Sequence, residues 1–244
     1  MEHSEYCDAV RSEGRTLGAA ARAAGVGAPV PSCPDWTVAD LLAHVGRLHR
    51  WVAAIVEAGE VDPPEHHWSA AEPPPAGERI EWFEHGVEVV ADALARAGAS
   101  RAAWSWTTDR TAGFWARRQA NETAVHRWDA QSAAGTTEPI GHTLAVDGID
   151  EFFALIPFWR GASALQGATA SSIHLHCTDG DGEWLLRLGA DGVVVTREHA
   201  KGDVALRAPA SALVLFLYGR VDASAGEVFG DAALLDRWQQ LVRW

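Results

Sequence analysis

The chain has 244 residues, with 33 acidic and 20 basic side chains, a formal net charge of −13 and no run rich in lysine or arginine. This balance argues against binding to nucleic acid phosphates or to anionic membrane surfaces, so we expect neither partner. We expect a reduced, cytoplasmic location, because the acidic N-terminus lacks the apolar core of a signal peptide, no stretch reaches the roughly 18 apolar residues that span a bilayer, and the three cysteines are widely separated.

The first half of the chain is predicted to be helical. Thr37 and Asp40 have the spacing of a capping box, and apolar residues then recur at helical intervals up to Gly59. A proline-rich segment, residues 61–77, cannot continue a helix and should be a long surface connection. The helices expected are residues 3–24, 37–58, 78–97 and 114–135, which together suggest an antiparallel four-helix bundle.

After Gly141 the pattern changes. A short helix over residues 146–156 is followed by three runs rich in β-branched or aliphatic residues, which should pair as antiparallel strands. The strands expected are residues 171–179, 182–189 and 191–198, and further helices are expected over 210–218 and 232–244. The expected fold class is therefore α+β, with one domain over residues 1–140 and a second over residues 141–244.

A metal site is predicted in the helical half. Glu122 and His126 lie four residues apart on one helix, so both side chains project from the same face. His44 lies at the edge of the apolar stripe of another helix, where it can face the bundle interior. Two imidazoles and one carboxylate suit zinc or another borderline divalent ion, and three protein ligands leave a coordination position open for a small thiol, which the cation would deprotonate.

Other interpretations of these residues are open. A histidine beside an apolar stripe is commonly a structural residue, and a Glu/His pair at this spacing is commonly a solvated contact. Further histidines are alternative ligands or simple surface residues: His49, His66, His67 and His85. His174 and His176 share one face of an expected strand, so they are a possible second pair of ligands that lacks a third partner nearby in sequence.

Three stretches of the chain resemble the mycothiol-dependent maleylpyruvate isomerase family of actinobacteria. They read VPSCPDWTVADLLAHVGRLHRWVA, RRQANETAVHRWDAQSAAG and IHLHCTDGDGEWLLRL. The resemblance implies a DinB-like four-helix bundle that carries the metal, followed by a small α/β domain similar to sterol carrier proteins. A single lysine, Lys201, and abundant alanine, arginine and glycine agree with an actinobacterial source.

The resemblance also implies particular site residues. The metal ligands of the family correspond to His44, Glu122 and His126. Relatives commonly have histidine where this chain has Asn121, so one histidine that would support a ligand or face the substrate is absent here while the ligand set is intact. The family uses an arginine of its C-terminal domain, for which Arg220 is the catalytic candidate, because a guanidinium can bind a substrate carboxylate with two hydrogen bonds. A cation at a helix C-terminus is an equal interpretation of Arg220, and the alternatives are Arg187, Arg197 and Arg207.

The implied function is a metal-dependent enzyme, with zinc as the favoured metal, that uses mycothiol as cofactor or cosubstrate. It would either isomerise a substrate of the maleylpyruvate type or transfer the thiol to an electrophilic metabolite. A non-catalytic metal- or ligand-binding protein of the same fold is the alternative. Trp36, Trp51 and Trp128 are expected mainly to fill the bundle, and Cys33 is expected to be structural rather than catalytic.

Overall fold

The computed structural model describes residues 1–67, 69, 72–164, 170–190 and 192–242, and the chain divides into two compact units, Met1–Glu138 and Pro139–Trp244. The described residues form a mixed α+β protein, in agreement with the predicted fold class. No described helix is both long enough and apolar enough to cross a membrane.

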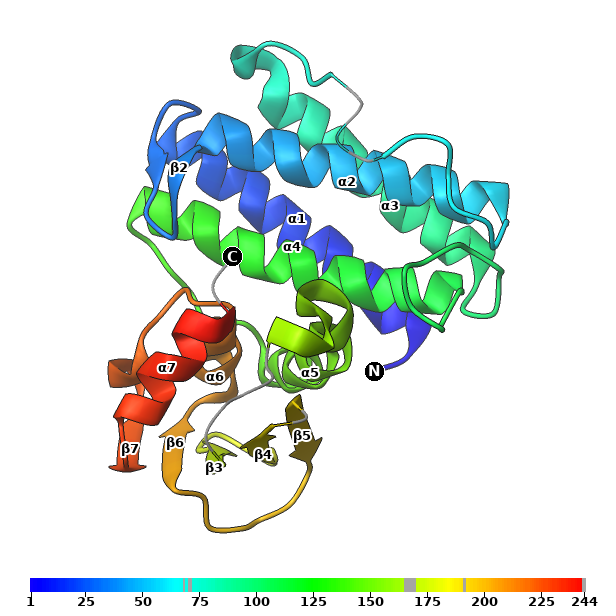
Figure 1. Cartoon of the computed structure of the whole chain (residues 1–244). Helices are drawn as coiled ribbons and strands as arrows, with labels where there is room; N and C mark the ends of the chain where they lie inside the picture. Colours follow the sequence, from blue (N-terminus) through cyan, green and yellow to red (C-terminus); the bar gives the residue numbers. More distant parts are fainter. Residues whose placement is uncertain (68, 70–71, 165–169, 191, 243–244) are drawn as a thin grey trace. The chain divides into compact units, whose positions relative to one another are not determined.

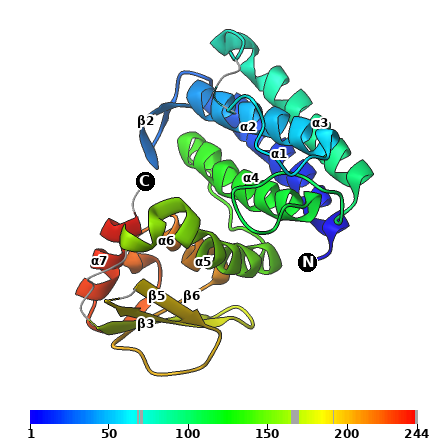
Figure 2. The same ribbon diagram turned by 45° about the vertical axis from the view of Figure 1, so that its right-hand side comes forward.

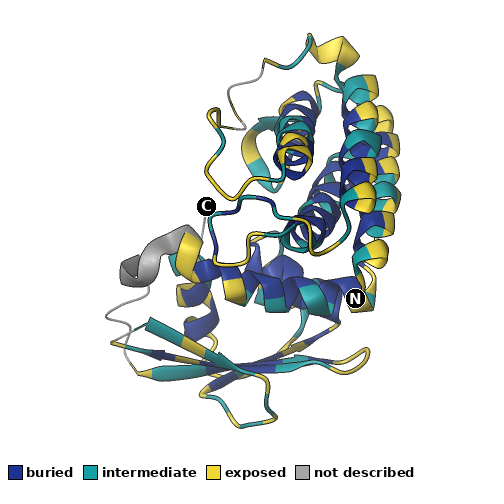
Figure 3. Ribbon diagram, turned by 90° about the vertical axis from the view of Figure 1, so that its right-hand side faces the viewer, coloured by how far each residue is buried: buried dark blue, intermediate teal, exposed yellow. Residues whose placement is uncertain are grey.

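The first unit is built from long helices that lie side by side (Figures 1 and 2). The four predicted helices are confirmed: α1 His3–Ala24, α2 Val38–Ala58, α3 Arg79–Ala97 and α4 Ala112–Ala134. Helix α4 packs against α1, α2 and α3, and most extensively against α1. Burial follows the expected pattern, with buried residues on the faces that the helices turn toward one another and exposed residues on the outer faces (Figure 3).

The start of α2 follows the predicted capping box. The Thr37 hydroxyl accepts a hydrogen bond from the Asp40 backbone N–H at 3.3 Å, and the Asp40 carboxylate accepts one from the Thr37 N–H at 3.0 Å. At the other end Gly59 adopts the left-handed conformation, with φ of 70°, and closes the helix. Both signals were readable from the local sequence because each acts within one helical turn.

A short hairpin precedes α2 and was not predicted. Strands β1 Pro29–Val30 and β2 Cys33–Thr37 pair in antiparallel fashion, in a segment to which the sequence assigned no strand. Cys33 lies half-buried at the start of β2. The hairpin matters because it carries residues that reach the candidate site.

The second unit contains a mixed sheet with helices on one of its faces (Figures 1 and 2). In the described residues, the strand order is β5-β4-β3-β6-β7, and β3 and β6 are parallel while the other neighbours are antiparallel. The elements are α5 His142–Ala164, β3 Ser171–Cys177, β4 Glu183–Gly189, β5 Gly192–Thr196, β6 Val204–Ala208, α6 Ala210–Leu217, β7 Glu227–Gly230 and α7 Ala233–Val242.

Three predictions for this unit need correction or extension. The helix expected over residues 146–156 is too short, because α5 begins at His142 and continues through Pro157, which interrupts the hydrogen-bond ladder without ending the helix. Strands β6 and β7 were missed because they are short and are stabilised by pairing with distant segments. The last two residues of the helix expected over 232–244 lie outside the described residues.

Candidate metal centre

Helices α2 and α4 bring His44, Glu122 and His126 together. Both imidazole Nε2 atoms lie 3.1 Å from the same carboxylate oxygen, Glu122 Oε1. The two imidazole rings are 5.0 Å apart at a steep angle of 72°. The side chains of His44 and Glu122 are 21% and 19% exposed and that of His126 is 8% exposed, so the group lies at the edge of the bundle core and is still reachable from solvent.

Four polar side chains follow one face of α4 at intervals of four, four and three residues. They are Arg118, Glu122, His126 and Asp129. Arg118 donates a hydrogen bond to Glu122 Oε2 at 2.7 Å, which leaves Oε1 for the two histidines. These buried polar side chains explain why α4 has few large aliphatic residues although it packs against the other three helices.

Asp129 orients the imidazole of His126. The fully buried carboxylate accepts a hydrogen bond from His126 Nδ1 at 2.8 Å and another from the hydroxyl of Ser32, in the β1–β2 hairpin, at 2.5 Å. Occupation of Nδ1 by this bond directs Nε2 toward Glu122. A carboxylate behind a histidine in this way is the usual support of a metal-binding imidazole.

Glu122 and His126 each shift the pKa of the other. Burial alone would raise the pKa of Glu122, but the charges of His126 and Arg118, with hydrogen bonds from His126 and His44, hold it well below its usual value. Burial opposes protonation of His126, but the charge of Glu122 and the bonds to Asp129 and Glu122 raise its pKa to about 9. Glu122 is therefore an anion and His126 a cation at neutral pH, so a metal ion would replace the His126 Nε2 proton.

Trp36 lies beside the group rather than in the bundle interior. Its ring, from strand β2, is 5.0 Å from the ring of His44 and 6.3 Å from that of His126, and the residue is half-buried. The expectation that Trp36 mainly fills the bundle is therefore wrong. Trp51 and Trp128 are also half-buried, and Trp51 packs edge-on against Trp104 and Trp115.

The alternative histidine ligands in the first unit do not join this group. His49 is fully buried five residues after His44, and its Nε2 is 3.1 Å from the hydroxyl of Thr123. The other three are exposed: His66, His67 and His85. Asn121 is buried on α4, next in sequence to Glu122 and so on a different face of the helix.

Burial of His49 makes the stability of the protein depend on pH. Desolvation lowers the pKa of His49 to about 3, against 6.5 for an exposed histidine. Between these values the unfolded chain binds a proton that the folded protein does not, so stability falls as pH decreases below 6.5. His49→Gln should reduce the slope of unfolding free energy against pH between 5 and 6.5 by about 1 kcal/mol per pH unit.

Urea unfolding of both proteins with a chelator present measures this slope. His126 is present in both proteins, so its own proton uptake contributes equally to the two slopes and cancels in their difference. Equal slopes for the variant and the wild type would contradict the assignment of a neutral, buried His49.

The arginine candidates of the second unit all have partners within that unit. Arg220 follows α6, and its Nη1 donates to the carbonyl of Tyr218 at 2.9 Å, as a cation at a helix C-terminus does. The three alternatives pair with carboxylates: Arg187 with Glu198, Arg197 with Asp150 and Arg207 with Glu227.

Sequence reasoning missed Arg118, Asp129 and Ser32. Arg118 and Asp129 lie four residues before Glu122 and three after His126, so their helical spacing placed them on the same face and was a usable signal. Ser32 lies 97 residues from Asp129, and no local pattern connects them.

The fold and this group define a class of α+β protein in which a helical unit carrying a His–Glu–His cluster precedes a mixed-sheet unit. Residues 7–131 match the family model of the mycothiol maleylpyruvate isomerase N-terminal domain, and residues 143–237 match that of the MDMPI C-terminal domain. The chain therefore belongs to the mycothiol-dependent maleylpyruvate isomerase family, which confirms the predicted resemblance.

Solved structures agree on the fold. The crystal structure of the mycothiol-dependent maleylpyruvate isomerase is similar to this chain with a TM-score of 0.60 and 13% identity, over 93% of each chain. A histidine-to-alanine mutant of that enzyme matches with the same values. No curated protein sequence matches the chain.

Proposed function

We propose that this protein is a metal-dependent enzyme that uses mycothiol, either to isomerise a substrate of the maleylpyruvate type or to transfer the thiol to an electrophilic metabolite. The observation that carries the proposal is the convergence of His44 Nε2 and His126 Nε2 on one oxygen of Glu122. Family membership supports an enzyme and the use of mycothiol.

The donor set fits a borderline divalent ion, for which zinc is our first choice. Two imidazole nitrogens and one carboxylate oxygen are common ligands of catalytic zinc, and such sites keep a position open. His44, Glu122 and His126 would hold the ion, which when bound would lower the pKa of a thiol at the open position and so supply a nucleophile at neutral pH.

The surrounding residues prepare the ligands. Asp129 fixes the orientation of His126, and Arg118 holds the second oxygen of Glu122, so that neither ligand side chain needs to be ordered when the site is filled. Trp36 covers part of both imidazoles and limits their contact with water. For a substrate that carries a carboxylate, Arg220 is our candidate for its recognition.

The two reactions share their first step. The thiolate adds to an electrophilic carbon of a double bond, and the electron pair moves onto the conjugated carbonyl. In isomerisation the adduct rotates about the former double bond and expels the thiolate, so mycothiol is unchanged. In transfer the adduct takes up a proton and is released as the conjugate.

The test is to purify the protein, measure its metal content and mix it with mycothiol and a panel of electrophiles, including maleylpyruvate, while mass spectrometry follows both partners. Turnover with mycothiol unchanged supports isomerisation, and a stable conjugate supports transfer. Bound metal without either reaction would favour a non-catalytic binding protein. Reaction rates that are unaffected by chelation of the metal would reject the metal-dependent mechanism.

A further inference from the structure

A second group of imidazole and carboxylate side chains lies in the sheet of the second unit. Because side chains alternate along a strand, Ile173 and Leu175 of β3 are buried on one face while His174 and His176 share the opposite face. Glu183 stands directly opposite His176 on the antiparallel strand β4. Two paired strands therefore hold three potential metal ligands on one side of the sheet.

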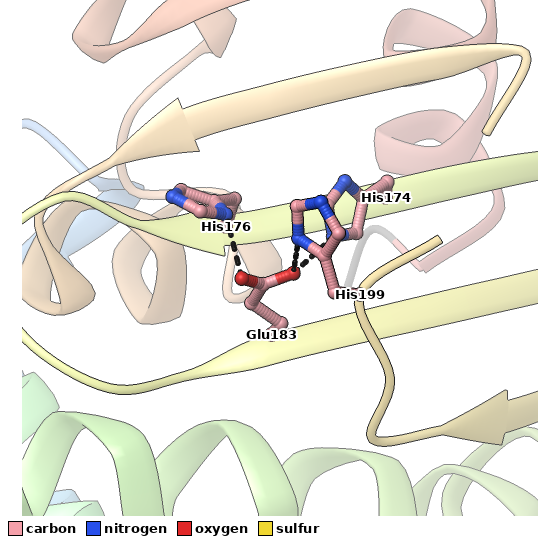
Figure 4. A group of neighbouring side chains, drawn as sticks. All are labelled: His174, His176, Glu183 and His199. Carbon is pink, nitrogen blue, oxygen red and sulfur yellow. Dashed lines mark hydrogen bonds and ion pairs between the residues drawn. The ribbon is translucent and has the colours of Figure 1, made fainter. Parts of the chain in front are cut away.

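His199 completes the group from the segment between β5 and β6. Its Nδ1 lies 2.6 Å from Glu183 Oε2, and His174 Nε2 lies 3.0 Å from the same oxygen. His176 Nδ1 lies 3.1 Å from the other oxygen, Oε1. Figure 4 shows the three imidazoles arranged around the single carboxylate.

The spacing of the donor atoms suits one ion. The ring centroids are 5.7, 5.9 and 6.1 Å apart in pairs, and one donor atom from each of the four residues lies within 4.8 Å of the others. Tetrahedral zinc with bonds of about 2.1 Å needs donors about 3.4 Å apart, so the donor contacts to Glu183 must lengthen slightly and the wider spacings must shorten. The exposed His199 side chain, at 79% exposure, is free to make most of this adjustment.

The type of donor selects the type of ion. Three neutral imidazoles with one carboxylate suit zinc, copper or nickel, whereas calcium and magnesium prefer oxygen ligands throughout. Four protein ligands also fill a tetrahedral site, as in structural zinc centres. The arginines on the same face, Arg187 and Arg207, pair with Glu198 and Glu227, so their charges are offset outside the group.

We infer that His174, His176, Glu183 and His199 form a second divalent-metal site, of the zinc type, which fastens the segment containing His199 to the sheet. The site is separate from the His44–Glu122–His126 group and does not depend on the proposed reaction. Its role is structural, because filling all four positions leaves none for a substrate.

Zinc binding by the full chain tests the inference. The His44→Ala/His126→Ala variant, in which the bundle group is removed, should still bind one zinc equivalent in competition with a chromophoric chelator. Adding His199→Gln or Glu183→Gln should weaken that binding by at least about tenfold. Cobalt(II) should give the intense visible absorption of a tetrahedral site in the first variant and lose it in the other two.

Two control variants accompany the zinc-binding experiment. His85→Gln makes the same chemical change at an exposed position of α3 and should leave zinc binding unaltered. If the alanine variant does not fold, His199→Gln in the wild-type background should lower the zinc stoichiometry from two to one, since His199 is exposed and its loss disturbs no core. Binding that is equally tight with and without His199 and Glu183, or no zinc binding by a folded bundle variant, would overturn the second site. Failure of the bundle site instead would appear as an unchanged stoichiometry in the His44→Ala/His126→Ala variant.

Discussion

Replacing His44 and His126 together by alanine should reduce kcat/KM for the mycothiol-dependent reaction by at least about 10³-fold, because a metal that activates a nucleophile contributes several kcal/mol to the barrier and each 1.36 kcal/mol is about tenfold. The imidazoles are two of the three donors that meet at the bundle site. Steady-state kinetics with mycothiol in excess measures the loss. The zinc stoichiometry should fall by one equivalent at the same time.

A matched pair of exposed histidines provides the control. His67→Ala/His85→Ala removes the same two functional groups outside the cluster and should retain wild-type kinetics. Asp129→Asn is an intermediate case, since it keeps all three ligands but weakens the orientation of His126, and it should lower metal affinity by about 10- to 100-fold. Wild-type turnover by the His44→Ala/His126→Ala variant would exclude the bundle group as the reaction centre.

Arg118→Met should destabilise the metal-free protein by about 2 kcal/mol, because the Glu122 carboxylate loses the charged hydrogen bond from Arg118 and keeps only His126 as a buried cationic partner. Methionine keeps much of the side-chain volume, so the packing loss is small. The double variant Arg118→Met/Glu122→Gln removes the charge of both partners, and its destabilisation should be smaller than the sum of the two single effects by about 1–3 kcal/mol. Urea unfolding in the presence of a chelator measures the three variants and the wild type.

The wild type, the two single variants and the double variant form a double-mutant cycle, which provides the control for this prediction. Glu122→Gln alone should also destabilise the metal-free protein, since it replaces the charged hydrogen bond between Glu122 and Arg118, only 4% exposed, by a weaker neutral one. Additivity of the two substitutions within about 0.5 kcal/mol would show that the pair is not coupled, and Arg118 would then have no part in positioning Glu122.

Local signals explain how much of the fold the sequence predicted. Each bundle helix is marked by signals within its own sequence. For α2 these are the Thr37–Asp40 capping box at its start and Gly59 at its end. Strands β3, β4 and β5 follow one another through short turns and were also predictable. Strand β6 was missed because its neighbour β3 lies in parallel across two intervening strands, a pairing that no local pattern encodes.

The two clusters of candidate ligands differ in how many of their residues could be predicted from the sequence. Helical spacing predicted that Glu122 and His126 lie on one face of their helix, and family resemblance favoured His44 over the other histidines of the bundle. In the sheet, the spacing of His174 and His176 indicated two ligands on one face. Their partners Glu183 and His199 were not proposed, because strand register and the path of the segment after β5 set their positions.

The sequence by itself determined the helices of the bundle, the three strands joined by short turns, the family, and the residues that share a helix or strand face, because each depends on interactions between near neighbours or on recognisable motifs. Only the tertiary structure decided which faces meet. It brought His44 against Glu122 across 78 residues and His199 against Glu183 across 16, and it placed Ser32 behind Asp129. Packing of whole elements sets these distances, since a metal centre needs donors to converge within a few ångströms whatever their separation along the chain.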